Sequence, residues 1–161
     1  MSHYNFKKNL NKNFTNLFDI LYKESKKAFK LGEVPVAALV YDPVNKLVIS
    51  KAHNSNRKNF NPCGHAEIQA ILKACKKLKK SRLDNYDLFC SLEPCMMCSS
   101  IIFHSKLRRV YFSVEEKKMG AMVNNLKLGL NSKLSYKTKI YYGFDEERFS
   151  KLLKDFFKDK R

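Results

Sequence analysis

The sequence predicts an α/β domain in which helices pack in layers against a sheet. Segments with the character of β-strands alternate with segments of helical periodicity along the chain. Of the 161 residues, 44 % are hydrophobic, which is enough to form a sizeable core. No repeat and no Gly/Ser/Pro-rich linker divides the sequence, so we expect a single domain over residues 1–161, with residues 1–13 as a flexible basic N-terminal extension.

The first helix is expected from Phe14, because the apolar residues that follow recur at helical spacing. Gly32 is a suitable end for it. Two strands are expected next, at Val36–Tyr41 and Lys46–Ser50, since both segments are rich in β-branched and other apolar residues. Pro43 lies in the turn-forming sequence DPVN between them, so the pair predicts a hairpin.

The rest of the chain alternates in the same way. The expected elements are a helix over residues 65–80, a strand at Tyr86–Ser91, a helix over residues 95–106, a strand at Arg108–Ser113, a short strand at Lys139–Gly143 and a final helix over residues 145–161. The strand, helix and strand of residues 86–113 predict two parallel strands joined by a crossover. The final helix carries one apolar stripe and is expected to cover the sheet.

The balance of charge indicates a polyanionic partner. The chain has 32 Lys and Arg against 15 Asp and Glu, a formal net charge of +17, and nucleic acid is the simplest partner for such a surface. Lysine supplies 26 of the 32 positive charges. Biased amino-acid usage is therefore an alternative explanation, since lysine is a less discriminating phosphate ligand than arginine.

The cysteine content and hydropathy exclude two classes of protein. Five cysteines, an odd number scattered among helices and strands, do not suit a disulfide framework. No apolar run approaches the length of about 18 residues that a membrane span needs. The start of the chain has basic residues but no apolar segment typical of an export signal, so we expect a cytoplasmic protein whose thiols stay reduced.

The segment SLEPCMMCSS, residues 91–100, places two cysteines three positions apart. Pro94 suits the first position of a helix, so Cys95 and Cys98 are expected on one face of the first turn. Two thiolates and one imidazole nitrogen form a zinc site that leaves a fourth position for water. His65, in PCGHAEIQA, is the candidate for the nitrogen ligand.

Glu67 follows His65 by two residues, a spacing that puts them on opposite sides of a regular helix. The two side chains can converge only where a loop becomes a helix, which is where we expect them. A redox pair and ordinary helix packing are alternative roles for the two cysteines. Another alternative is a non-catalytic RNA-binding module with structural zinc, whose fourth ligand would come from another cysteine or histidine: Cys63, Cys75, Cys90 or His104.

The motif H-A-E followed about thirty residues later by P-C-M-M-C resembles the signature of zinc-dependent nucleobase deaminases. Together with GEVPVAALV, IIFHSKLRRVYFSVEEKKMGA and the ending LLKDFFKDKR, it resembles the bacterial tRNA-specific adenosine deaminases of the TadA family. The resemblance implies a three-layer cytidine-deaminase-like fold, with a mixed five-stranded sheet and helices on both faces. It also implies a homodimer that converts the wobble adenosine in the anticodon of an arginine tRNA to inosine.

The resemblance implies roles for individual residues as well. His65, Cys95 and Cys98 match the ligands of one Zn²⁺ ion per subunit, and Glu67 matches the proton shuttle. Asn54 and Val36 fall at positions that contact the target nucleotide. The chain departs from the family pattern at Ala37, where glycine is usual, and at Glu116, where aspartate is frequent.

Basic residues outside the pocket are expected to hold the phosphates of the anticodon stem-loop; the candidates are Lys117, Lys118, Lys158, Lys160 and Arg161. A solvated surface is the alternative role for these side chains. The nearest alternative activity is the zinc-dependent deamination of a free base or nucleotide, such as guanine, cytosine or dCMP, because the ligands and the glutamate are shared across that superfamily.

Overall fold

A mixed β-sheet lies at the centre of the computed structural model, which describes residues 4–5, 12–130 and 137–158. Its strands are β1 (Tyr4–Asn5), β2 (Ala37–Asp42), β3 (Leu47–His53), β4 (Asp87–Leu92), β5 (Arg109–Val114) and β6 (Lys139–Tyr142). Their order in the sheet is β1-β6-β5-β4-β2-β3. The strands β1, β6, β5 and β4 are mutually parallel, whereas β2 is antiparallel to both β4 and β3.

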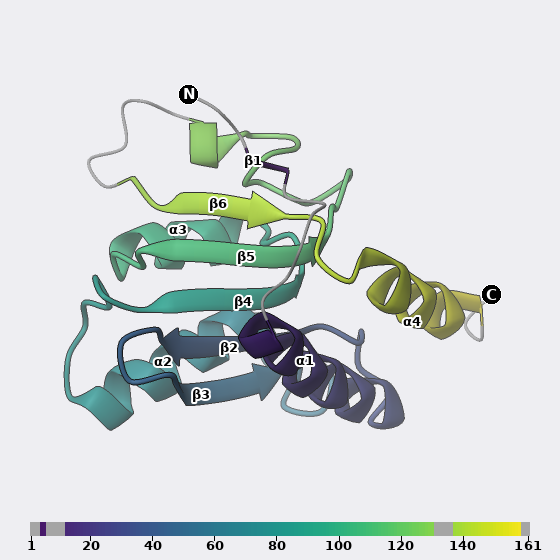
Figure 1. Ribbon diagram of the computed structural model, residues 1–161. Coiled ribbons are helices and arrows are strands. Elements are labelled where there is room, and N and C mark those ends of the chain that lie inside the picture. Colours follow the sequence, from purple (N-terminus) through teal and green to yellow (C-terminus); the bar gives the residue numbers. More distant parts are fainter. Residues whose placement is uncertain (1–3, 6–11, 131–136, 159–161) are drawn as a thin grey trace.

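Helices cover both faces of this sheet, so the fold has the three layers that were expected (Figure 1). They are α1 (Lys12–Lys30), α2 (Ala66–Leu78), α3 (Met96–His104) and α4 (Glu146–Lys158), with a short 3-10 helix η1 at Leu128–Leu130. Helices α2 and α3 share one face and contact each other, while α1 and α4 meet on the other.

The alternation of side chains along the strands explains why both faces are covered. In β4, Leu88 and Cys90 belong to the core under α2 and α3, whereas Phe89 belongs to the core under α1 and α4. In β5, Val110 packs on the first side and Tyr111 on the second in the same manner. Because successive side chains of a strand point to opposite faces, strands that are apolar throughout must be buried on both sides.

The core under α1 and α4 is largely aromatic. Phe89 and Tyr111 stack with their ring centroids 4.6 Å apart. The ring centroid of Phe18 on α1 lies 5.7 Å from that of Phe89, and the centroid of Phe149 on α4 lies 6.4 Å from that of Phe18. Both pairs have edge-to-face geometry. Most of the apolar stripe predicted for the final helix is buried and fixes α4 against α1 and the sheet, whereas Phe157 at its end is 50 % exposed.

Most element boundaries agree with the predictions within a few residues, and the parallel pairing of β4 and β5 is confirmed. The first helix ends at Lys30, close to Gly32, which has the positive φ of 73° that glycine adopts without strain. The predicted second strand is longer than expected, because its pairing with β2 continues to His53. The five expected strands are present, and β1 adds a short sixth at the edge beside β6.

The prediction for Pro94 was wrong in detail. Helix α3 begins at Met96, and Cys95 is its N-cap residue with extended backbone angles, φ −71° and ψ 176°. Pro94 therefore lies before the cap and not at the first helical position. Its carbonyl oxygen accepts a hydrogen bond from Ala121 N–H at 2.9 Å, which holds the later loop against this helix start.

No helix among the described residues is long and apolar enough to cross a membrane.

The buried carboxylate of Glu24, on α1, joins this helix to strand β3. Glu24 Oε1 lies 2.8 Å from Lys27 Nζ and 3.0 Å from Lys51 Nζ, and Glu24 Oε2 lies 3.2 Å from His53 Nδ1. Burial raises the pKa of Glu24, but hydrogen bonds from these three basic side chains outweigh it and lower the pKa from 4.5 to about 2.

Glu24→Gln is expected to lower the free energy of unfolding by about 2 kcal/mol at pH 7. Because the folded pKa lies below the unfolded one, this stabilisation is fully present above pH 4.5 and is lost as the pH falls toward about 2. Urea unfolding of both proteins between pH 7 and pH 3 should show the difference shrinking with acidity. Asp155→Asn, which removes a solvent-exposed pair with Lys151, should change stability little at any pH. A constant difference between wild type and Glu24→Gln would contradict this assignment.

Candidate metal centre and active site

The starts of helices α2 and α3 meet at the predicted metal site. His65 is the N-cap residue of α2, with extended angles of φ −71° and ψ 143°, and Cys95 occupies the same position in α3. Cys98 lies three residues into α3 and is completely buried. Residues at a cap leave the helical path, so their side chains can turn toward a neighbouring helix start.

The three candidate ligands converge closely. The ligand atoms of His65, Cys95 and Cys98 all lie within 4.8 Å of one another. His65 Nδ1 is 3.7 Å from Cys95 Sγ and 3.5 Å from Cys98 Sγ. In a tetrahedral zinc site with ordinary Zn–S and Zn–N bond lengths, the nitrogen ligand and a sulfur ligand lie about 3.6 Å apart. The donor set and its spacing therefore fit zinc.

The two thiols differ in acidity, and that of Cys95 matches this use. Hydrogen bonding from the Cys98 thiol, followed by the effect of His65, lowers the pKa of Cys95 to about 4 despite partial burial. The pKa of Cys98 is raised, because its proton is shared with Cys95 and the side chain is buried. The Cys95 sulfur in turn raises the pKa of His65. One thiolate is thus already formed at neutral pH, and thiolates are the sulfur ligands that zinc binds.

Glu67 lies beside this group in the first turn of α2 and is 3 % exposed. Burial raises its pKa from 4.5 to about 7, while the positive charge of His65 opposes that rise. Its Oε2 atom is buried without a hydrogen-bond partner among the described residues. Buried polar atoms are nearly always paired, so an orphaned carboxylate oxygen beside a metal-ligand group indicates that a water or substrate binds there.

The group offers three candidate ligands among the residues that the structure describes. The four candidates for a structural fourth ligand, Cys63, Cys75, Cys90 and His104, all fall within the described residues and are not part of it. Three ligands leave one corner of a tetrahedron for water, which is the arrangement of a catalytic zinc site. The geometry favours catalysis over the structural-zinc module.

Comparisons with known proteins agree with this site. A family model described as MafB19-like deaminase matches residues 12–161. The tRNA-specific adenosine deaminase of Rickettsia felis is 38 % identical over 136 residues, which cover 84 % of this chain and 94 % of the relative. That of Aquifex aeolicus is also 38 % identical, over 88 % of this chain and 92 % of the relative.

The chain belongs to the tRNA-specific adenosine deaminase family.

A solved structure supports the assignment of fold and family. It comes from work on A-to-I editing by tRNA:A34 deaminases at the wobble position of transfer RNA, with a TM-score of 0.82 and 29 % identity over 86 % of this chain and 99 % of that one. The guanine deaminase of Nitrosomonas europaea has a TM-score of 0.74 at 20 % identity, over 86 % of this chain and 81 % of that one. The second likeness extends to the fold alone.

In this member of the tRNA-specific adenosine deaminase family, Asn54 and Val36 lie together beside the start of α2. Asn54 Oδ1 accepts a hydrogen bond from Ala66 N–H at 2.9 Å, and Asn54 N–H donates to the carbonyl oxygen of Val36 at 3.0 Å. The first bond fixes the amide plane of Asn54, so its Nδ2 is directed away from Ala66. The side chain of Val36 is buried in the core under α2 and α3.

The departure from the family pattern at Ala37 has a simple structural setting. Ala37 is fully buried in the core under α1 and α4, on the opposite face of the sheet from the metal ligands. Its methyl group therefore points away from the site. The Ala37 N–H donates to the side-chain oxygen Ser91 Oγ at 2.9 Å, and Ala37 pairs with His53 of β3.

Gln69 is a supporting residue that sequence reasoning missed. Its Nε2 donates to Ser55 Oγ at 2.6 Å and to the Gly64 carbonyl oxygen at 2.9 Å. These bonds join both ends of the loop between Asn54 and His65. A Cβ atom on Gly64 would lie 3.0 Å from backbone atoms of Asn56, so a larger residue would push the two ends of this loop apart by a few tenths of an ångström.

Glu93 is the second supporting residue that the sequence did not reveal. It is 2 % exposed, and its carboxylate accepts hydrogen bonds from four donors on the loop after β5: the backbone N–H groups of Glu116, Val123 and Asn124 at 3.0, 2.8 and 3.0 Å, and Asn124 Nδ2 at 2.5 Å. The same loop pairs with the metal site through a β-bridge between Gly120 and Cys95. The only sequence signal is the position of Glu93, directly before the Pro-Cys pair.

Glu93→Gln is expected to lower the free energy of unfolding by about 2–3 kcal/mol. The amide of glutamine would turn a donor toward groups that are themselves donors, and a neutral oxygen accepts more weakly than a carboxylate. Released from Glu93, the loop should also be cut faster by trypsin after Lys117 and Lys118. Urea unfolding and timed proteolysis would measure both effects.

The matched control is Glu115→Gln, because Glu115 is exposed and accepts one longer bond, from Asn124 Nδ2 at 3.2 Å. Its stability should stay within about 0.5 kcal/mol of the wild type. Equal effects of the two substitutions would contradict the role given to Glu93.

The basic residues predicted to hold phosphates are divided between two places. Lys117 and Lys118 are exposed on the loop that Glu93 holds beside Cys95. Glu116, in the same loop, uses Oε1 to accept the Lys118 N–H at 2.8 Å. Lys158 is exposed at the end of α4, whereas Lys160 and Arg161 lie outside the described residues.

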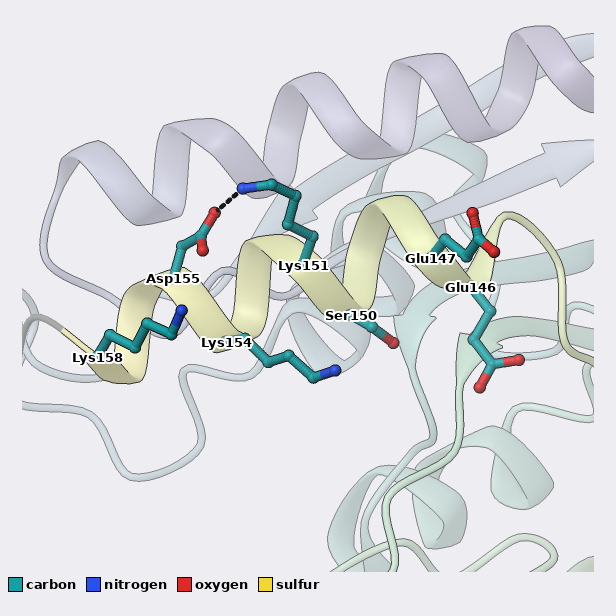
Figure 2. Close-up of a pocket in the computed structure, with 7 residues that line it drawn as sticks. All are labelled: Glu146, Glu147, Ser150, Lys151, Lys154, Asp155 and Lys158. Carbon is teal, nitrogen blue, oxygen red and sulfur yellow. Dashed lines mark hydrogen bonds and ion pairs between the residues drawn. The ribbon is translucent and has the colours of Figure 1, made fainter.

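The surroundings of Lys158 are shown in Figure 2. An open hollow runs along one side of α4, lined by Glu146, Glu147, Ser150, Lys151, Lys154, Asp155 and Lys158. Lys151 and Asp155 form an ion pair at 2.6 Å there. This surface carries three acidic side chains as well as three lysines, so its field is weaker than the number of lysines suggests.

Proposed function

We propose that this protein catalyses the hydrolytic deamination of the wobble adenosine to inosine in the anticodon of an arginine tRNA. The observation that carries the proposal is the convergence of His65, Cys95 and Cys98 beside the buried, unpartnered carboxylate of Glu67. The names of the relatives at 38 % identity support tRNA adenosine as the substrate.

His65, Cys95 and Cys98 would hold one zinc ion, which supplies a water molecule that ionises near neutral pH. Glu67 accepts one proton from the water and delivers it to N1 of the adenine; it then takes the second proton from the hydroxyl formed on C6 and delivers it to the leaving amine. The oxygen of the water forms the new bond to C6, the bond between C6 and the amine nitrogen breaks, and ammonia leaves. The balance is adenosine plus water giving inosine plus ammonia.

Asn54 and Val36 are proposed to contact the target nucleotide. Asn54 Oδ1 is occupied by Ala66 N–H, so its Nδ2 is the atom that remains to donate to the substrate. Val36 is buried next to Asn54, and the carbonyl oxygen of Val36 accepts a hydrogen bond from the Asn54 N–H. A base in an anticodon loop is already unpaired, which reduces the cost of placing it in a closed site.

A homodimer that binds tRNA in the cytoplasm completes the proposal. Three exposed apolar residues lie close in sequence to the metal ligands or their supporting loops: Phe60, Met96 and Met119, which are 95, 61 and 70 % exposed. Exposed apolar side chains near the site are suited to contact with a second subunit or with bases of the substrate. Light scattering coupled to gel filtration would give the mass in solution.

The test of the proposed activity is direct. The purified protein is incubated with an arginine tRNA transcript that has adenosine at the wobble position, and inosine is measured at that position by sequencing. A transcript with guanosine there should remain unchanged. Ammonia release from free guanine, cytosine or dCMP, without inosine in the tRNA, would establish the alternative activity instead.

A further inference from the structure

The C-terminal half of helix α2 and the residues after it form a surface that the proposed reaction does not use. We call it the α2 basic surface, and it consists of five exposed residues: Lys73, Lys76, Lys77, Lys79 and Lys80. Between Glu67 and Asp84 the sequence contains no acidic residue. This distinguishes the α2 basic surface from α4, where lysines and carboxylates line the same hollow (Figure 2).

Several of these lysines are held in place without losing their charge. Lys77 Nζ donates to the carbonyl oxygen of Ile49 at 3.1 Å, and Lys73 Nζ donates to that of Lys51 at 3.4 Å. Lys80 Nζ lies 5.4 Å from the ring centroid of Tyr86. Carbonyl oxygens and aromatic rings are neutral partners. None of the five lysines forms an ion pair with any residue that the structure describes, so their positive charges stay uncompensated.

Two ordinary explanations account for only part of the surface. Cations stabilise the C-terminal end of a helix, but that effect is confined to the last turn and does not extend to Lys73. Lysines also protect an exposed edge strand from pairing, and β3 is the edge of the sheet. That role suits Lys73 and Lys77, which contact β3, but not Lys76 or Lys79.

The surface is within reach of an RNA bound at the metal site. At the rise of an α-helix, Lys73 lies about 12 Å and Lys77 about 18 Å along the axis from His65. The outer side of α2 thus continues from the site as a row of positive charge. An anticodon loop is attached to a duplex stem, whose recognition by proteins depends mainly on its shape and phosphates.

We propose that the α2 basic surface binds the phosphate backbone of duplex RNA adjoining the loop that carries the target adenosine. This inference rests on the proposed function, since it takes tRNA as the substrate. It assigns binding to α2 in addition to the loop and α4 lysines predicted from the sequence. Lysines at fixed positions are suited to this task, because backbone contacts require positive charge without base recognition.

The test compares two variants with equal loss of charge. The first is Lys73→Gln/Lys76→Gln/Lys77→Gln on α2. The control is Lys23→Gln/Lys26→Gln/Lys30→Gln on α1, where three exposed lysines lie on the opposite face of the sheet. Lys27 is left out of the control because it pairs with Glu24.

Binding of a full-length arginine tRNA transcript is measured for the wild type and both variants from 50 to 200 mM salt. The α2 variant should bind about 10- to 100-fold more weakly at about 100 mM salt, and the slope of log K against log salt should fall by about 2. Its KM for tRNA should rise while kcat at saturating tRNA stays unchanged, because the metal site is intact. The α1 control should behave like the wild type.

Equal weakening of binding in both variants would overturn the inference, since it would show a general effect of net charge. Unchanged tRNA binding with self-association of the α2 variant, detected by gel filtration, would also overturn it in favour of edge protection. Failure of the proposed function is distinguishable from both results: the wild type itself would then form no inosine. Inosine formation by all three proteins with equal KM values would refute only the role of the α2 basic surface.

Discussion

Glu67→Gln is expected to lower kcat for inosine formation by at least about 10³-fold while zinc stays bound. Glutamine has nearly the same shape as glutamate but cannot accept and return a proton, and Glu67 is not among the three convergent ligands. The measurements are inosine formed per minute in a wobble-adenosine tRNA, and zinc per chain by elemental analysis.

The stability of the same variant provides a second, independent readout. Glu67 Oε2 has no hydrogen-bond partner among the described residues, and burial raises the pKa of this carboxyl to about 7 despite the opposing charge of His65, so its surroundings disfavour the ionised form. The variant should therefore be as stable as the wild type or more stable, as expected where a residue serves function at the expense of stability. Glu147→Gln, an exposed change on α4, is the control and should keep full activity. Normal turnover by Glu67→Gln would exclude it as the proton shuttle.

Cys98→Ser is expected to remove zinc and activity together, lowering the metal content from about one ion per chain to nearly none. A serine hydroxyl stays protonated near neutral pH and is a poor replacement for a thiolate ligand. Because Cys98 is fully buried between α3 and the start of α2, the loss should also lower the melting temperature. Chelation of the wild type should reproduce that shift, since metal binding and folding are coupled.

The control for Cys98→Ser is Cys75→Ser. Cys75 lies on α2 outside the metal-ligand group, and its Sγ is 3.9 Å from the Ser81 carbonyl oxygen. This variant should retain zinc and activity. A second control, Cys63→Ser, tests the nearest candidate in sequence for a fourth ligand and should give the same result. Zinc retained by Cys98→Ser, or lost equally by either control, would contradict the three-ligand site.

Much of the fold was predictable because local patterns determine both the type of each element and the face that it buries. The apolar stripe of the final helix and the continuous apolar character of residues 86–91 predicted a helix on the sheet and a strand buried on both sides, and both are present. Strand β1 was not predicted, because two residues are too few for any periodic signal. The position of Pro94 was misjudged by two residues, since a cap is set by backbone angles that no side-chain pattern records.

The candidate site divides in the same way. His65, Cys95 and Cys98 were identifiable because metal ligands must be of a few residue types at restricted spacings. Glu93 and Gln69 were not identifiable, because their roles depend on partners that are distant in sequence or on a loop whose path is not encoded locally. Glu93 binds groups 23 to 31 residues away, and only the parallel pairing of β4 with β5 brings them together.

The sequence by itself determined the α/β class, the residues able to bind a metal and an excess of positive charge. The tertiary structure decided that the two helix starts meet, that no additional described side chain completes the ligand group, and that Lys73 and Lys77 of α2 contact the edge strand β3. The physical reason is range: spacing along the chain fixes which side chains share a face, whereas the distance between faces depends on the packing of the whole domain.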